Sequence, residues 1–134
     1  MELIVIAALV AFATALGFLH KALSGRARQL VKTQDLPAGV VLGTDATLLQ
    51  FSTEVCSPCR ATHTVLHRLA HENDGLSHVD LDITHRADLA AQFNILQTPT
   101  TFILDATGTI RARIGGAVKR DTVLAELDRI LIAA

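Results

Sequence analysis

The stretch STEVCSPCRAT, residues 52–62, holds both cysteines of the chain, Cys56 and Cys59, with two residues between them. A disulfide stabilises a fold mainly by restricting the unfolded chain, and this effect is small for so short a loop. The pair therefore indicates a reactive dithiol or two ligands of a metal ion rather than a structural bridge.

The sequence around the pair predicts a helix that begins at about Ser57, with Pro58 in its first turn, where proline is tolerated. Cys56 would then lie at the helix start, where unpaired N–H groups and the helix dipole favour a thiolate. Cys59 would lie about one turn inside on the same side, placed to resolve a mixed disulfide formed on Cys56. Arg60 adds a positive charge nearby.

A metal site is the alternative, because Cys56, Cys59, His63 and His67 follow one another with a spacing similar to that of zinc sites. However, Cys56 and His67 would be ~16 Å apart along one continuous helix, and all ligands of a tetrahedral zinc ion must lie within ~2.3 Å of it. We therefore expect no metal here. His63, His67 and His71 recur every four residues and predict a solvated helix face rather than a metal site or proton relay.

The beginning of the chain differs in composition from the rest. Residues 3–19 carry no charge and are just long enough to span a bilayer, with Lys21 able to reach the interface. No basic residue precedes this run, so we expect residues 1–23 to be a retained transmembrane anchor instead of a cleaved signal peptide. Alanines at every fourth position could pair two anchors into a weak homodimer; they are Ala7, Ala11 and Ala15.

The chain after the anchor is expected to face the cytoplasm, because basic residues follow the apolar run and none precedes it. The alternative is an extracytoplasmic domain. The formal net charge of the whole chain is −1, which gives no indication of nucleic-acid binding. The flanking basic residues are Lys21, Arg26, Arg28 and Lys32.

Glycine and proline mark residues 24–45 as a linker, with a short strand expected near Val40 to Leu42. Residues 46–134 alternate between strand and helix patterns, which predicts one α/β domain with a mixed sheet and helices on both faces. Strands are expected at 46–51, 78–83, 100–104 and 109–114, the last two as a hairpin. Three helices are expected. The first begins at about Ser57, the second is short and has Thr84 as its N-cap, and the last has Asp121 as its N-cap.

From about Ala46 to Leu131 the sequence resembles the thioredoxin family. The resemblance rests on LLQFSTEVCSPCR at 48–60, ILQTPTTFIL at 95–104 and IRARIGGA at 110–117. It implies a thioredoxin-like fold, a cis peptide before Pro99, and a substrate groove formed by the active-site loop, Thr98, Pro99 and Gly115. The loop residues are Ser57, Pro58 and Arg60, and the backbone of Thr98 would pair with an extended substrate.

Several positions depart from the family pattern. Val55 replaces its tryptophan, Gln50 its buried aspartate and Asp80 a nearby lysine, while Ser57 and Pro58 replace its central Gly-Pro. Gln50 and Glu54, the acid nearest in sequence to the cysteines, are therefore the expected tuning residues. The family's first strand and helix hardly fit between Arg26 and Ala46, so we expect a shortened fold there.

Together these features predict a membrane-tethered thiol–disulfide oxidoreductase, a protein disulfide reductase that requires no cofactor because the Cys56–Cys59 pair carries the electrons. Its substrate would be a protein or small-molecule disulfide, and a separate upstream reductant would regenerate it. The alternatives are a dedicated electron donor to a peroxidase or sulfur-transfer partner, and a non-catalytic module that binds a metal or a partner. Short anchored members of this kind resemble actinobacterial proteins.

Overall fold

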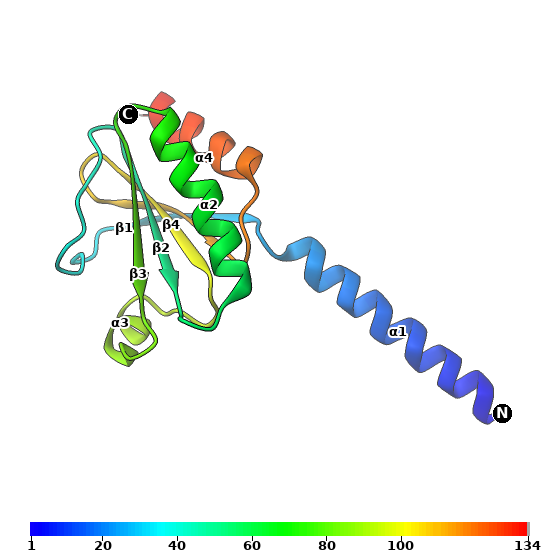
Figure 1. Ribbon diagram of the computed structural model, residues 1–134. Coiled ribbons are helices and arrows are strands. Elements are labelled where there is room, and N and C mark those ends of the chain that lie inside the picture. The colour runs from blue at the N-terminus through cyan, green and yellow to red at the C-terminus, as the bar shows by residue number, and fades with distance from the viewer. Residues whose placement is uncertain (134) are drawn as a thin grey trace.

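The computed structural model describes residues 1–133, which form a five-stranded mixed sheet with helices packed on both faces and one helix extending away from it (Figure 1). The helices are α1 (Glu2–Leu23), α2 (Ser57–Glu72), α3 (Ala87–Gln92) and α4 (Arg120–Ile132). The strands are β1 (Ala27–Lys32), β2 (Ala46–Ser52), β3 (Leu76–Asp82), β4 (Thr100–Asp105) and β5 (Ile110–Gly115).

The strand order is β1-β5-β4-β2-β3, and only β2 and β3 pair in parallel among the described residues. Strand β2, which lies between β4 and β3, is buried along its whole length, as its largely apolar sequence predicts. Side chains of a strand point alternately to opposite faces. Leu48 of β2 therefore joins the core under α2 and α4, while Leu49 and Phe51 join the core under α3.

The first of these cores explains why α2 and α4 lie on the same face of the sheet in Figure 1. Leu66 and Leu69 of α2 and Val123 of α4 are fully buried in it, as the helical spacing of apolar residues in both segments predicts. The spacing of apolar residues in α4 also predicts Leu131 on this face, but Leu131 is 47% exposed, whereas Ile130 in the same turn is buried in the core.

The first strand of the sheet lies at Ala27–Lys32, so its expected position near Val40 to Leu42 is wrong. β1 is an edge strand that pairs antiparallel with β5 and leaves most of its side chains exposed. Its mixed, largely polar composition suits an edge strand, but it lacks the apolar run or alternation that would predict a strand from the sequence. No helix occurs between β1 and β2, in line with the expected shortening.

Two expected helix caps are also wrong. Helix α3 has Arg86 at its N-cap, because Thr84 instead donates its hydroxyl hydrogen to Asp82 in the preceding turn. Helix α4 has Lys119 at its N-cap, and Asp121 lies in the first turn. A carboxylate in the first turn interacts favourably with the helix dipole, so Asp121 still marks the start of this helix in the sequence.

Helix α1 is long and apolar enough to cross a membrane, and none of its residues is buried against the rest of the protein. A signal sequence near the N-terminus would meet the same criteria of length and composition. The helix joins the domain through Gly25, whose backbone N–H donates to the Gly115 carbonyl at the end of β5 over 2.8 Å.

Candidate active site

Cys56 and Cys59 are joined by a disulfide at the start of α2, with their Cα atoms 5.2 Å apart. Cys56 is the N-cap residue of this helix, and its sulfur accepts a hydrogen bond from the Cys59 backbone N–H over 3.2 Å. Cys59 is only 4% exposed, whereas Cys56 is half-buried. An incoming substrate therefore reaches the sulfur of Cys56 more readily than that of Cys59.

Gln50 lies directly behind the buried cysteine. Its side chain is fully buried, and its amide nitrogen donates to the Cys59 carbonyl over 2.9 Å. Its amide oxygen lies 3.2 Å from Nε2 of His78 on β3. Both ends of the amide thus have partners, which a buried polar side chain requires.

A cavity of about 420 Å³ opens beside the disulfide, and both cysteines, Arg60 and His63 contribute to its lining. Asp80 also lines it and lies across the sheet from Gln50 in the register of β2 and β3. The Asp80 carboxylate is 2.9 Å from Nδ1 of His63 and accepts a hydrogen bond from the hydroxyl of Ser52. An ion-pairing group therefore faces the same cavity as the two cysteines.

The sequence analysis missed the pairing of His63 with Asp80. One signal was available, because His63 follows Cys59 by four residues and so lies on the same side of α2. The position of Asp80 next to α2 could not be predicted from local sequence, because it depends on the parallel pairing of β2 with β3.

The environment of His78 sets it apart from the exposed histidines. Burial lowers the pKa of His78 from 6.5 to about 4, and the neighbouring His63 and His67 contribute in the same direction, against an opposing effect of Asp80. His78 is therefore a neutral imidazole at physiological pH.

The segment before β4 brings the expected groove residues to the active-site loop. The Thr98–Pro99 peptide bond is cis, and the hydroxyl of Thr98 lies 3.3 Å from that of Thr53 in the loop. The Pro99 carbonyl accepts a hydrogen bond from the Gly116 N–H over 2.8 Å. Gly115 pairs with the first residue of β4, and a Cβ there would lie 2.4 Å from the Gln97 amide nitrogen.

Two large apolar side chains are exposed next to these segments. Val55, immediately before Cys56, is 97% exposed, and Leu96, two residues before Thr98, is 83% exposed. Ser57, Pro58 and Arg60 are exposed in the first turn of α2. The expected tuning residue Glu54 is also exposed, and its backbone N–H donates to Thr84.

Comparison with known proteins gives a consistent result. The thioredoxin family model matches residues 30–129. Thioredoxin H2 of Arabidopsis thaliana is 35% identical over 72 residues, which are 54% of this chain and 53% of that protein, so the chain spans about half the length of this curated relative.

Solved structures share the fold at lower identity. Chloroplastic thioredoxin z superposes with a TM-score of 0.60 at 22% identity, covering 68% of this chain and 81% of that one. Thioredoxin-2, described as a component of malaria parasite protein secretion machinery, gives 0.59 at 20% identity, covering 73% and 99%. With its matching sequence region, thioredoxin-like fold and CxxC disulfide at a helix start, the chain belongs to the thioredoxin family.

Proposed function

We propose that this protein is a membrane-tethered reductase of protein disulfides, with Cys56 as the nucleophile and Cys59 as the resolving thiol. The observation that carries the proposal is the asymmetry of the pair, since Cys59 is 4% exposed and Cys56 is accessible at the N-cap of α2. No cofactor takes part, because the two sulfur atoms carry both electrons.

The reaction proceeds through two exchanges. The Cys56 thiolate attacks one sulfur of the substrate disulfide, forming a mixed disulfide and releasing the other substrate sulfur as a thiolate. The Cys59 thiol loses its proton and attacks the Cys56 sulfur, which releases the second substrate thiolate. The substrate gains two electrons, the Cys56–Cys59 pair loses two, and an upstream dithiol reductant restores the pair.

The N-cap geometry supports the first step. In the oxidised pair the Cys59 N–H already donates to the Cys56 sulfur, and the same donor would stabilise a thiolate there. A negative charge at this position is also favoured by the dipole of the 16-residue helix α2. Cys56 is therefore the better nucleophile and the better leaving group of the two.

Substrate positioning is assigned to the backbone of Thr98, with Pro99 and Gly115 as the walls of a groove. The contact between Thr98 and Thr53 joins this segment to the active-site loop. The exposed apolar side chains of Val55 and Leu96 flank the two segments and favour a substrate peptide with apolar residues near its disulfide.

The tether in this proposal is α1, which is fully exposed along its 22 residues and ends three residues before β1 begins. The basic residues that follow it, Arg26 and Arg28 among them, support a cytoplasmic position of the redox domain. Such a tether restricts the enzyme to substrates that come to the membrane surface.

Insulin reduction by the full-length protein in detergent micelles, driven by dithiothreitol, tests this function. We expect activity that survives a metal chelator, that Cys56→Ala abolishes, and that His71→Ala on the exposed side of α2 leaves unchanged. Activity that persists in Cys56→Ala, or that the chelator removes, would contradict the proposal.

A trapping experiment then identifies the substrate class. Cys59→Ala should accumulate mixed disulfides on Cys56, since the resolving step is blocked. Adducts found on Cys59 in the Cys56→Ala protein but not on Cys56 would reverse the roles. A single peroxidase or sulfur-transfer protein in the trap, instead of several disulfide proteins, would favour a dedicated electron donor.

A further inference from the structure

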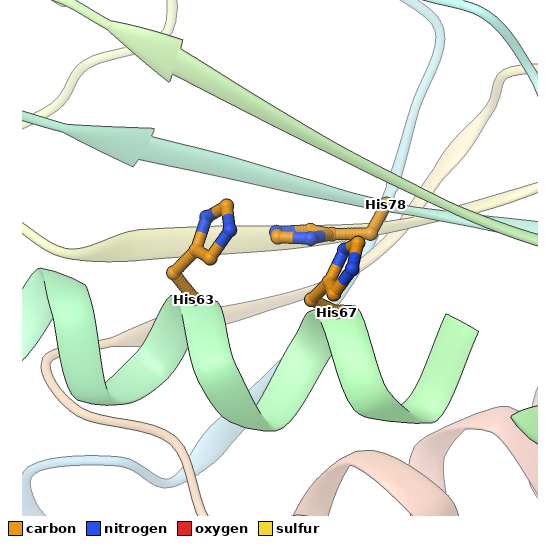
Figure 2. Close-up of side chains that lie close together, drawn as sticks. All are labelled: His63, His67 and His78. Carbon is orange, nitrogen blue, oxygen red and sulfur yellow. The ribbon is translucent and has the colours of Figure 1, made fainter. Parts of the chain in front are cut away.

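Three histidines gather between α2 and β3 (Figure 2). His63 and His67 lie one turn apart on α2, and His78 reaches them from β3 (Figure 2). The ring centroids are 5.7 Å apart for His63 and His67, 4.9 Å for His63 and His78, and 6.2 Å for His67 and His78. One ring nitrogen from each of the three lies within 4.8 Å of the others.

Neighbouring acceptors hold two of these rings. Nδ1 of His63 is 2.9 Å from the Asp80 carboxylate, and Nε2 of His78 is 3.2 Å from the amide oxygen of Gln50. An imidazole that donates one N–H to a carboxylate or carbonyl keeps the lone pair of its other nitrogen for a metal ion. Such outer contacts are the usual companions of histidine ligands, because they fix the tautomer and the ring orientation.

The distances suit an ion after a small adjustment. Zinc–nitrogen bonds of ~2.0–2.1 Å in a tetrahedral site place the ligand nitrogens ~3.4 Å apart, so the nitrogens within 4.8 Å must approach by no more than ~1.4 Å. His67 is exposed and can rotate toward the half-buried His78, while the exposed His63 keeps its contact with Asp80. Their exposure also leaves a fourth position open to water.

We propose that His63, His67 and His78 bind one divalent transition-metal ion of the zinc class, which clamps α2 to β3. Three imidazoles suit zinc, copper and nickel rather than magnesium or calcium, which prefer oxygen ligands. The site differs from the C-x2-C-x3-H-x3-H set considered in the sequence, because it uses neither cysteine and takes its third ligand from another element. The disulfide-bonded protein can therefore bind the ion.

Calorimetric titration of the tag-free, full-length, disulfide-bonded protein in detergent with zinc chloride tests the site. We expect one ion per chain, at least tenfold weaker binding for His67→Ala, and unchanged binding for His71→Ala, its matched exposed neighbour on α2. Both variants should keep the circular dichroism spectrum of the wild type, since neither residue is buried. Absence of binding, or equal losses in the two variants, would overturn the proposal.

Two further measurements separate this site from the dithiol. A Cys56→Ser/Cys59→Ser protein should bind zinc as tightly as the disulfide-bonded wild type, whereas loss of binding in it would assign the ion to the cysteines. Zinc in excess should raise the unfolding temperature of the wild type more than that of His67→Ala, because stabilisation by a ligand grows with its affinity for the folded protein. An equal rise in both proteins would contradict the clamp.

Discussion

Gln50 connects two chemical centres through one buried side chain. Its amide nitrogen donates a hydrogen bond to the carbonyl of Cys59, and its amide oxygen lies 3.2 Å from Nε2 of His78. The Gln50 side chain is fully buried. The resemblance to the thioredoxin family places an ionisable carboxyl at this position, and an amide does not titrate in the physiological range. In the proposed mechanism, an amide at this position cannot accept a proton from Cys59 during its attack, whereas a carboxylate could.

Replacement of Gln50 by aspartate should add a carboxylate-linked step to the pH dependence of the resolving reaction. A carboxylate behind Cys59 can accept the proton of the attacking thiol, which speeds a step limited by the small thiolate fraction at neutral pH. The measurement is the rate at which the mixed disulfide on Cys56 is released, as a function of pH.

The matched control is Gln50→Asn, which has the same length as the aspartate variant and cannot titrate. The wild type and the asparagine variant should each follow a single thiol-like ionisation. Superimposable profiles for the aspartate and asparagine variants would show that position 50 does not act on Cys59.

The helix α2 combines a reactive end with a packed side. Cys56 caps its N-terminus, while Leu66 and Leu69 bury the opposite side against the sheet. Most of the stability of a helix in a protein comes from such tertiary packing of its apolar side. The position of the disulfide therefore depends on an apolar contact made two to three turns away.

Truncation of Leu66 to alanine should lower the free energy of unfolding by about 2–5 kcal/mol, because the side chain is fully buried and leaves a cavity. Urea unfolding followed by circular dichroism measures the change. Leu131→Ala on α4 is the control, since that side chain is 47% exposed and should lose much less. Similar losses in the two variants would mean that α2 is not anchored through Leu66.

In the hairpin between β4 and β5, the Asp105 carboxylate accepts several hydrogen bonds and pairs with Arg111. Burial alone would raise the pKa of Asp105, but hydrogen bonds from Thr107, Arg111 and Thr109 outweigh it and lower the pKa below 3.8. The Arg111 Nε lies 2.7 Å from the carboxylate. The folded state thus holds the charged form more strongly than the unfolded chain does.

A group with a lowered pKa in the folded state contributes stability above its unfolded value, and loses that contribution as the pH falls through the folded value. Asp105 should therefore stabilise the protein above about pH 4 and lose this effect in stronger acid. Urea unfolding between pH 7 and pH 2 should show a smaller acid-induced loss for Asp105→Asn than for the wild type. A difference in the free energy of unfolding between Asp105→Asn and the wild type that stays constant with pH would refute the assignment.

At the scale of the whole molecule, a redox domain is attached to an apolar helix at one defined point. The backbone N–H of Gly25 donates a hydrogen bond to the carbonyl of Gly115. The segment that follows α1 therefore meets the domain beside the end of β5 that forms part of the proposed groove. In Figure 1 the helix extends away from the sheet and leaves the CxxC end of α2 uncovered. Helix α1 therefore does not cover the disulfide.

Fusions to the C-terminal residue should report a cytoplasmic domain in cells. Basic residues follow α1 and none precedes it, and positive flanks tend to remain on the cytoplasmic side. A fluorescent reporter that folds only in the cytoplasm should be active there. Alkaline phosphatase activity in the matching fusion, without that fluorescence, would place the domain outside.

Local patterns in the sequence were sufficient to predict much of the fold. The strand before the cysteines, the helix from Ser57 and the hairpin around residues 105–108 depend on apolar periodicity, proline tolerance and turn residues, and all are present. The resemblance of residues 95–104 to the thioredoxin family also implied a cis peptide before Pro99, and the structure has it. Each of these signals lies within one short segment, so no knowledge of tertiary pairing was needed.

The tertiary structure alone decided the features that join distant segments. The edge strand β1 has no apolar pattern of its own and is held by its partner β5. Asp80 and His78 face α2 because alternate residues of a strand share a face, and the parallel register of β2 and β3 brings that face to Gln50. The histidine cluster therefore depends on two features: the spacing of four residues between His63 and His67 on α2, and the pairing of β3 with β2, which no single segment of the sequence encodes.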